Sequence, residues 1–228
     1  SLGQLRPINQ ALPLLEKAAA VSAGSSTQTS PVSPTPDSTQ TVETLVGQPD
    51  LPRLALSPAD VEAEGMNGFV VDWSQMIDQR GVPAMIGLDE SWSDRLEETN
   101  LEKVYQLALT AQEDQAAPTT ITSTLWQYPS PRDAESGFAF TEEELEATYQ
   151  IADLPAESFG DESELSTWSF TDSGTGEDMV AFEATARVGA LVGTVRVGGP
   201  STSEQELRAD AANLGAALAA RLAAADDG

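Results

Sequence analysis

The sequence predicts an α+β domain: a mostly antiparallel sheet with helices packed on one face, plus an N-terminal helix on a low-complexity tether. Three observations lead to this class. Strand-like stretches follow one another with short turns between them, two long stretches have a helical apolar stripe, and one tract is rich in Ser, Thr and Pro. The order strand, strand, helix, three strands, helix is typical of a sheet covered by helices. With 228 residues, 40% of them hydrophobic, the chain can bury a core of moderate size.

The first 44 residues divide into two predicted parts. Residues 1–20 form a predicted helix, because Leu5, Ile8, Leu12, Leu15 and Ala19 are spaced by three or four, although Pro13 should kink it. This apolar stripe either docks on the protein's own domain or is offered to a partner or a second copy, which would make a dimer. Residues 21–44 are a predicted Ser/Thr/Pro-rich linker, because such a composition buries too little apolar surface to fold. Residues 45–228 are then a single α+β domain.

The first strands are predicted from alternation and from β-forming residues. We expect a strand at 68–73, a short helix or a loop at 91–100, and a turn at 114–118. Tyr105, Leu107 and Leu109 alternate with polar or small residues, which indicates a half-buried strand from residue 104. Residues 119–128 are rich in β-branched and aromatic side chains and predict the next strand.

A helix should follow, because Ser130 and Pro131 suit the N-cap and the first helical position. Its apolar face should carry Ala134, Phe138, Leu145 and Tyr149, and Gly137 is its weak point.

Three further strands, at 164–171, 179–188 and 191–197, precede the last helix. Gly189 and Ala190 suit a type II′ turn, and this turn fixes the register between the last two strands. The expected pairs are Val188–Leu191, Ala184–Val195 and Phe182–Val197 on the core face, with Thr185–Thr194 and Glu183–Arg196 on the other.

The closing helix has the strongest pattern in the chain. Ser203 and Glu206 form a capping box, and an apolar stripe follows at Leu207, Ala211, Leu214, Leu218 and Leu222.

Net charge restricts the possible partners. The formal charge is -26, so nucleic acid and anionic membranes are disfavoured. The acidic surface either reflects adaptation to high salt, which screens self-repulsion, or collects cations or a basic partner.

No apolar run approaches the roughly 20 residues that span a bilayer, and the start is not signal-like, so we expect a soluble chain without a transmembrane segment.

Common catalytic machinery is missing from the sequence. Without cysteine or histidine there is no thiolate and no imidazole base, which excludes Ser-His-Asp and Cys-His catalysis. The phosphate-binding, dinucleotide-binding, G-x-S-x-G and serine-lysine motifs are absent too. We therefore predict a non-enzymatic protein with no catalytic residues. A hydrolase that uses paired carboxylates is the alternative, but close pairs arise by chance among 37 acidic residues.

Two acidic loops are candidate calcium sites, because hard cations take carboxylate oxygens. The candidate ligands are Asp161, Glu162, Asp172 and Asp178, with Glu164 and Glu177 beside them. Neither loop has EF-hand spacing, so a solvated turn is the competing interpretation, and no other cofactor is predicted.

Aromatic side chains supply the candidate ligand-binding residues. Trp126 and Tyr128 share a strand face, and such a pair at a sheet edge can line an apolar pocket instead of joining the core. The candidates are Trp126, Tyr128, Phe138 and Trp168.

The second half resembles bacterial secreted or lipid-anchored proteins of unknown function. The likeness covers about residues 104–225 and lies in Leu154-Pro155, the run Phe159-Gly160-Asp161-Glu162-Ser163, Arg187-Val188-Gly189, and the alanine-rich last helix. The lipid-bearing cysteine that such proteins often have is missing here. The resemblance and the tether together predict an extracytoplasmic domain, secreted or tethered at the cell surface, that binds a small molecule or a protein partner. A carboxylate hydrolase and an acidic calcium-binding module are the alternatives.

Overall fold

In the computed structural model, residues Pro49–Gly228 form one compact unit. Within it the structure describes residues 49–82, 90–112, 119–148, 151–155, 158–172 and 174–226. The predicted N-terminal helix at 1–20, the linker at 21–44 and the turn at 114–118 therefore lie outside the described residues.

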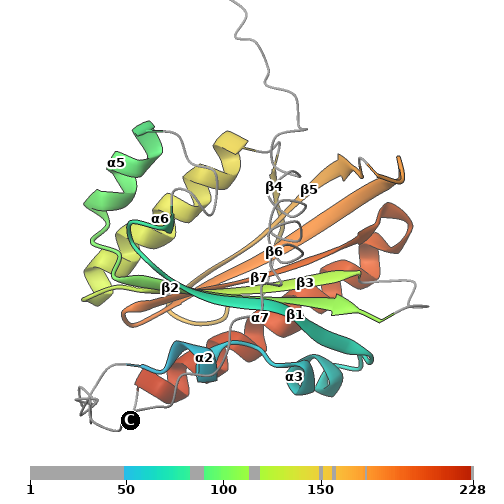
Figure 1. Ribbon diagram of the computed structural model, residues 1–228, viewed down its shortest axis with the longest axis horizontal. Coiled ribbons are helices and arrows are strands. Elements are labelled where there is room, and N and C mark those ends of the chain that lie inside the picture. Colours follow the sequence, from blue (N-terminus) through green and yellow to red (C-terminus); the bar gives the residue numbers. More distant parts are fainter. Residues whose placement is uncertain are drawn as a thin grey trace, which may run out of the picture. The chain divides into compact units, whose positions relative to one another are not determined.

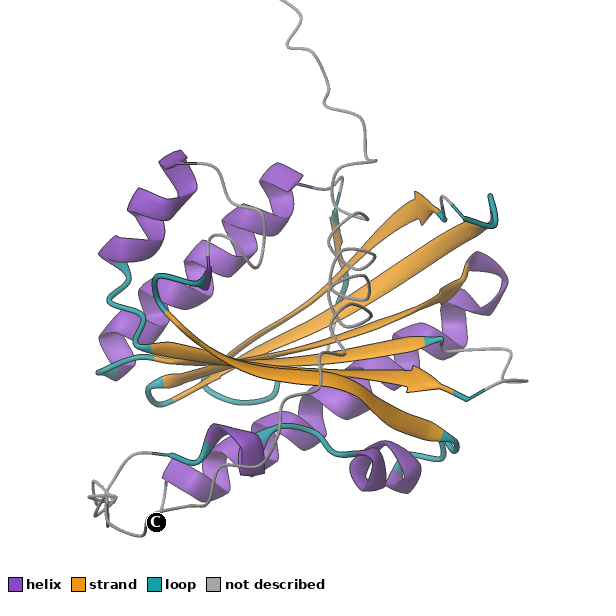
Figure 2. Cartoon of the chain, viewed as in Figure 1, coloured by secondary structure: helices purple, strands orange, loops and turns teal. Residues whose placement is uncertain are grey.

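A seven-stranded antiparallel sheet forms the centre of this unit, which confirms the α+β class (Figure 2). The spatial order is β1-β2-β3-β7-β6-β5-β4, so β1 and β4 are the two ends of the sheet. The strands are β1 (Phe69–Asp78), β2 (Lys103–Ala111), β3 (Thr120–Gln127), β4 (Ala152–Asp153), β5 (Glu162–Thr171), β6 (Asp178–Val188) and β7 (Leu191–Pro200).

The predicted register between β6 and β7 is confirmed. The structure pairs Val188 with Leu191, and the other four expected pairs follow along the same two strands. Gly189 has a φ of 55° and Ala190 is not among the described residues with positive φ, which fits a type II′ turn. The expected separation of faces follows, because Glu183 and Arg196 lie opposite each other on the side away from Phe182.

One face of the sheet carries the main core and the last helix, α7 (Glu204–Asp226), which a short 3₁₀ turn at Ser201–Ser203 precedes. The predicted stripe of α7 is buried in a cluster with Phe182, Val195 and Val197. The short helices α2 (Leu51–Leu54) and α3 (Pro58–Ala63) lie on the same side (Figure 1). Arg221 of α7 holds this layer together, because it donates to the Ala55 carbonyl at 2.7 Å and pairs with Asp60.

The other face is covered in part by α5 (Glu90–Glu98) and α6 (Pro131–Thr148), as Figure 1 shows. This corrects the expectation that the helices pack on one face. The reason lies in β3, where Leu125 is buried toward α7 while its neighbour Trp126 is buried beneath α6. A strand that is apolar on both sides needs cover on both sides. Below we call these two sides the α7 face and the α6 face.

Candidate functional site

The α6 face of the sheet is polar along its middle. Trp126 and Val192 are paired neighbours within the apolar cluster beneath α6, so the alternation of side chains assigns every second residue of each strand to this face. One cross-strand row on this face runs across five strands through Gln106, Thr124, Thr194, Thr185 and Glu164. Its three threonines are buried, so this part of the sheet buries polar groups where an ordinary core would bury apolar ones.

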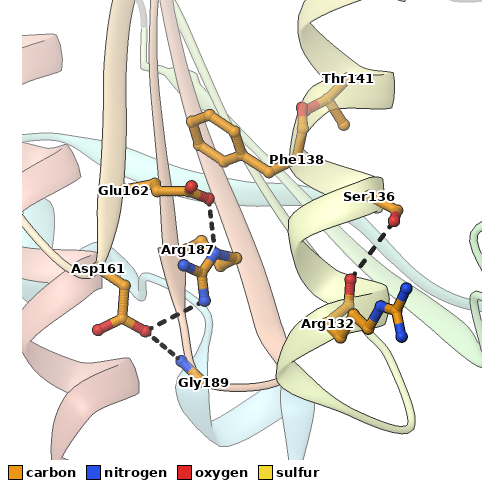
Figure 3. Close-up of polar contacts among 8 residues, drawn as sticks. All are labelled: Arg132, Ser136, Phe138, Thr141, Asp161, Glu162, Arg187 and Gly189. Atoms are coloured by element: carbon orange, nitrogen blue, oxygen red, sulfur yellow. Dashed lines mark hydrogen bonds and ion pairs between the residues drawn. The ribbon is translucent and has the colours of Figure 1, made fainter.

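An arginine-carboxylate network lies at one side of that row (Figure 3). Arg187 donates to Glu162 at 2.7 Å and to Asp161 at 3.3 Å, and its own side chain is only 14% exposed. Asp161 also accepts the Gly189 amide at 2.9 Å, which ties the network to the turn between β6 and β7. Phe138 points from α6 toward the Glu162–Arg187 pair.

A second ion pair lies on the other side of the row. Arg196 donates to Glu183 at 2.9 Å, and Glu183 is only 5% exposed. The Arg196 guanidinium also lies over the Trp168 ring, 4.8 Å from its centroid. Both carboxylates that flank the row therefore have arginine partners.

Glu164 lies between these two ion pairs and differs from both. Its Oε1 atom is buried and has no hydrogen-bond partner within the part of the chain that the structure describes. Burial, together with the charges of Glu142, Asp153, Glu183 and Glu146, raises the pKa of Glu164 to about 7. Near neutral pH this side chain is thus divided between its protonated and ionised forms.

We call Glu164 and the four carboxylates that raise its pKa the Glu164 cluster. Its members come from four elements: Glu142 and Glu146 from α6, Asp153 from β4, Glu164 from β5 and Glu183 from β6. Burial and the charges of Glu146, Asp153 and Glu143 also raise the pKa of Glu142. Glu146 and Asp153 are exposed, so the cluster reaches solvent at its rim. Such an arrangement favours a proton or a positively charged group over an anion.

The predicted ligand-binding aromatics lie on the α6 face but in two places. Trp126, Tyr128 and Phe138 belong to the cluster beneath α6, and the first two are buried. Trp168 is buried in a separate small cluster with Ala181. The structure therefore brings Trp126, Tyr128 and Phe138 together, whereas Trp168 lies apart from them and packs against Arg196.

Tyr128 illustrates how tightly α6 packs on the sheet. A Cβ atom at Gly137 would collide with the Tyr128 ring and hydroxyl, so glycine at this position lets the helix approach. The hydroxyl of Tyr128 is buried and has no hydrogen-bond partner among the described residues, and burial raises its pKa.

The four candidate calcium ligands lie at opposite ends of the β5–β6 hairpin and have protein partners. Asp161 and Glu162 bind Arg187 at the start of β5. Asp172, beyond the end of β5, accepts the Gly174 and Thr175 amides, which lower its pKa. The Thr171 hydroxyl donates to Asp178 at 3.5 Å. Within the part of the chain that the structure describes, no group of three or more acidic side chains is placed to hold a metal ion.

Sequence reasoning missed most of the Glu164 cluster. The pairing of Glu183 with Arg196 was predicted, and Glu164 was noted as part of an acidic loop. Glu142 and Glu146 are spaced by four on α6, which places them on one helix face and was the available signal. The two residues of β4 are too few to carry a periodic signal.

None of the helices in the described residues is long and apolar enough to cross a membrane. No protein-family profile matches the sequence, and no curated protein matches it either. The structure is similar to the extracellular domain of PknH from Mycobacterium tuberculosis, with a TM-score of 0.48 and 11% identity. The match covers 78% of this chain and 95% of that one. A likeness at this level carries no argument about function.

Proposed function

We propose that this protein is a non-enzymatic, extracytoplasmic binding domain whose Glu164 cluster recognises a positively charged group on a small molecule or a protein partner. The observation that carries the proposal is the state of Glu164. Its buried Oε1 has no hydrogen-bond donor among the residues that the structure describes, whereas Glu162 and Glu183 on the same face are each bound by an arginine. A buried acceptor without a donor is costly, so a ligand that supplies the donor gains that energy.

The chemistry of the cluster favours an amine or a guanidine. Such a group would donate charge-assisted hydrogen bonds to Glu164 and relieve its repulsion with Glu142 and Asp153. Glu146 and Asp153 at the rim are exposed, so a ligand from solvent would meet these two carboxylates first. Phe138, which points toward the same face, adds an apolar contact for the carbon chain of the ligand.

Two sequence features support a place outside the cytoplasm. The linker at 21–44 has the composition of a flexible tether, and residues 104–225 resemble secreted or lipid-anchored bacterial proteins. Fractionation of the natural host, with an antibody against the domain, tests this part of the proposal. Recovery in the cytoplasmic fraction alone would contradict it.

Calorimetric titration with agmatine and lysine amide, with succinate as the anionic control, tests the binding proposal. We expect the two cations to bind and succinate to give no heat of binding. Glu164→Gln should weaken binding about tenfold, the magnitude of a lost charge-assisted hydrogen bond. Glu135→Gln changes the same charge at an exposed position of α6 and should leave the affinity unchanged. Equal binding by both variants would remove Glu164 from the site.

A carboxylate-dependent hydrolase is the second candidate, and one observation favours it. Glu164 and Glu183 share a face but have unlike environments, which is the arrangement that acid-base catalysis requires. Against it, Glu183 is almost fully buried and engaged by Arg196. A screen of chromogenic glycosides separates the two functions. Turnover that both Glu164→Gln and Glu183→Gln abolish would establish the hydrolase, and the binding proposal predicts no turnover.

A further inference from the structure

Exposed apolar side chains gather on a single strand, β1. In the described part of the chain, the large apolar residues that stand out as exposed are Val70 at 42%, Val71 at 49% and Met76 at 49%. All three belong to Phe69–Asp78. Exposed apolar residues are normal when they are scattered, but a group on one element marks an interaction surface.

β1 also lies at an end of the sheet. It pairs with β2 on one side, and within the described residues no strand pairs with its other side (Figure 1). The backbone donors and acceptors along that side can therefore pair with another chain. At ten residues β1 is much longer than β4, the two-residue strand at the opposite end.

Most of this edge is regular. The pairing with β2 shifts between Val71 and Trp73, which makes a bulge at Asp72. From Trp73 to Asp78 the register then continues without a shift. These six residues span about 20 Å, the length of an ordinary strand, so a partner segment of that size can pair along them.

The charge on β1 selects among possible partners. The strand carries Asp72 and Asp78 but no lysine or arginine, and the whole chain has a net charge of -26. A second copy would bring the same carboxylates and the same net charge against this edge. An extended segment with basic side chains would be attracted instead.

We propose that β1 is a docking edge for an extended, basic segment of a partner protein, which adds to the sheet as an eighth strand. Backbone hydrogen bonds along residues 73–78 provide the pairing. The partner's apolar side chains cover Val71 and Met76, and its basic side chains pair with Asp72 and Asp78. Strand addition of this kind obtains affinity from the main chain and specificity from alternate side chains. This surface is independent of the Glu164 cluster.

The test uses the isotope-labelled full chain and three capped peptides as long as β1. The first alternates valine and lysine, the second replaces lysine with glutamate, and the third replaces every second valine of the first with proline. The lysine peptide should shift the backbone amide resonances of residues 73–78 and protect some of these amides from hydrogen exchange. The glutamate peptide is repelled, and the proline peptide lacks the donors for a strand ladder, so neither should do this.

Two variants locate the peptide on the sheet. Met76→Lys puts a positive charge on β1, which repels the lysine peptide, and it removes the apolar contact at this position. The affinity for the lysine peptide should therefore fall about tenfold. Ser169→Lys adds the same charge at an exposed position of β5 and should leave the affinity unchanged. Three results would each overturn the proposal: equal binding of the proline peptide, an equal loss in both variants, or dimerisation through β1 without peptide.

Discussion

At the scale of single residues, the environment of a carboxylate decides what it can do. Glu162, Glu164 and Glu183 lie on one face of the sheet, and arginines bind the first and the third. The buried Oε1 of Glu164 has no donor among the described residues. The sequence shows three similar glutamates. The register of β5 with β6 places Arg187 beside Glu162, and the register of β6 with β7 places Arg196 beside Glu183. The turn at Gly189 predicted the second pair, but no sequence signal gave the first pair or the unlike position of Glu164.

The raised pKa of Glu164 predicts how its contribution to stability changes with pH. The pKa of Glu164 is about 7 in the folded protein and 4.5 in the unfolded chain, so the folded protein keeps this proton to a higher pH. The contribution of this protonation to the free energy of unfolding is therefore full below about pH 4.5 and is lost as the pH rises through 7. Glutamine mimics the protonated form. Glu164→Gln should match the wild type in acid and exceed its free energy of unfolding at pH 8 by about 1 kcal/mol, a value reduced for solvent screening.

Urea denaturation of both proteins at several pH values between 4 and 8 measures this difference. Glu135→Gln, on the exposed side of α6, is the control and should show no such pH-dependent gain. A pH-independent difference between Glu164→Gln and the wild type would contradict the assigned titration.

Gly137 predicts a conflict between helix propensity and packing. Alanine in place of a mid-helix glycine usually stabilises by about 1 kcal/mol. Here the new methyl group would collide with Tyr128, so we expect Gly137→Ala to destabilise the protein by about 2 kcal/mol. Thermal unfolding measures the change, with Ser136→Ala at an exposed neighbouring position as the control. A stabilised Gly137→Ala protein would show that α6 does not pack on Tyr128 as described.

At the scale of elements, the sequence predicts the long periodic segments well. The β6–β7 register followed from a glycine at the turn and from alternating side chains, and α7 followed from its apolar stripe. The strand at 68–73 continues to Asp78, and residues 90–98 are helical. The helices α2 and α3 were not predicted, because four and six residues are too few to show a periodic pattern. The placement of α5 and α6 on the second face depends on tertiary contacts of Trp126 and Tyr128.

The close docking of α7 on the sheet gives a prediction for this element. A Cβ atom at Gly215 would lie 2.5 Å from the Cβ of Ala184 on β6. Gly215→Ala should therefore destabilise the protein by about 1–3 kcal/mol, although alanine favours the helix. Ala216→Gly, at an exposed position of α7, measures the effect of helix propensity alone and should lower the free energy of unfolding by about 1 kcal/mol. If Gly215→Ala is as stable as the wild type, α7 lies farther from β6.

At the scale of the whole molecule, the net charge of -26 opposes compaction. Molar sodium chloride screens this repulsion and should raise the midpoint temperature of unfolding by at least about 2–4 °C. A stabilisation of about 1 kcal/mol produces a shift of this size in a protein of this length. Calcium at matched ionic strength should add nothing, because Asp161, Glu162 and Asp172 have protein partners. A further rise with millimolar calcium that a chelator reverses would establish a calcium site and contradict this expectation.

The proposed function depends on Glu164, whose buried Oε1 has no hydrogen-bond donor among the described residues and would take a positively charged group. Carbon-detected magnetic resonance of the Glu164 carboxyl, followed over pH with and without agmatine, tests it most directly. We expect a midpoint near pH 7 for the free protein and a lower midpoint with agmatine, because a bound cation favours the ionised form. A midpoint near 4.5 in the free protein, or one that agmatine leaves unchanged, would contradict the claim.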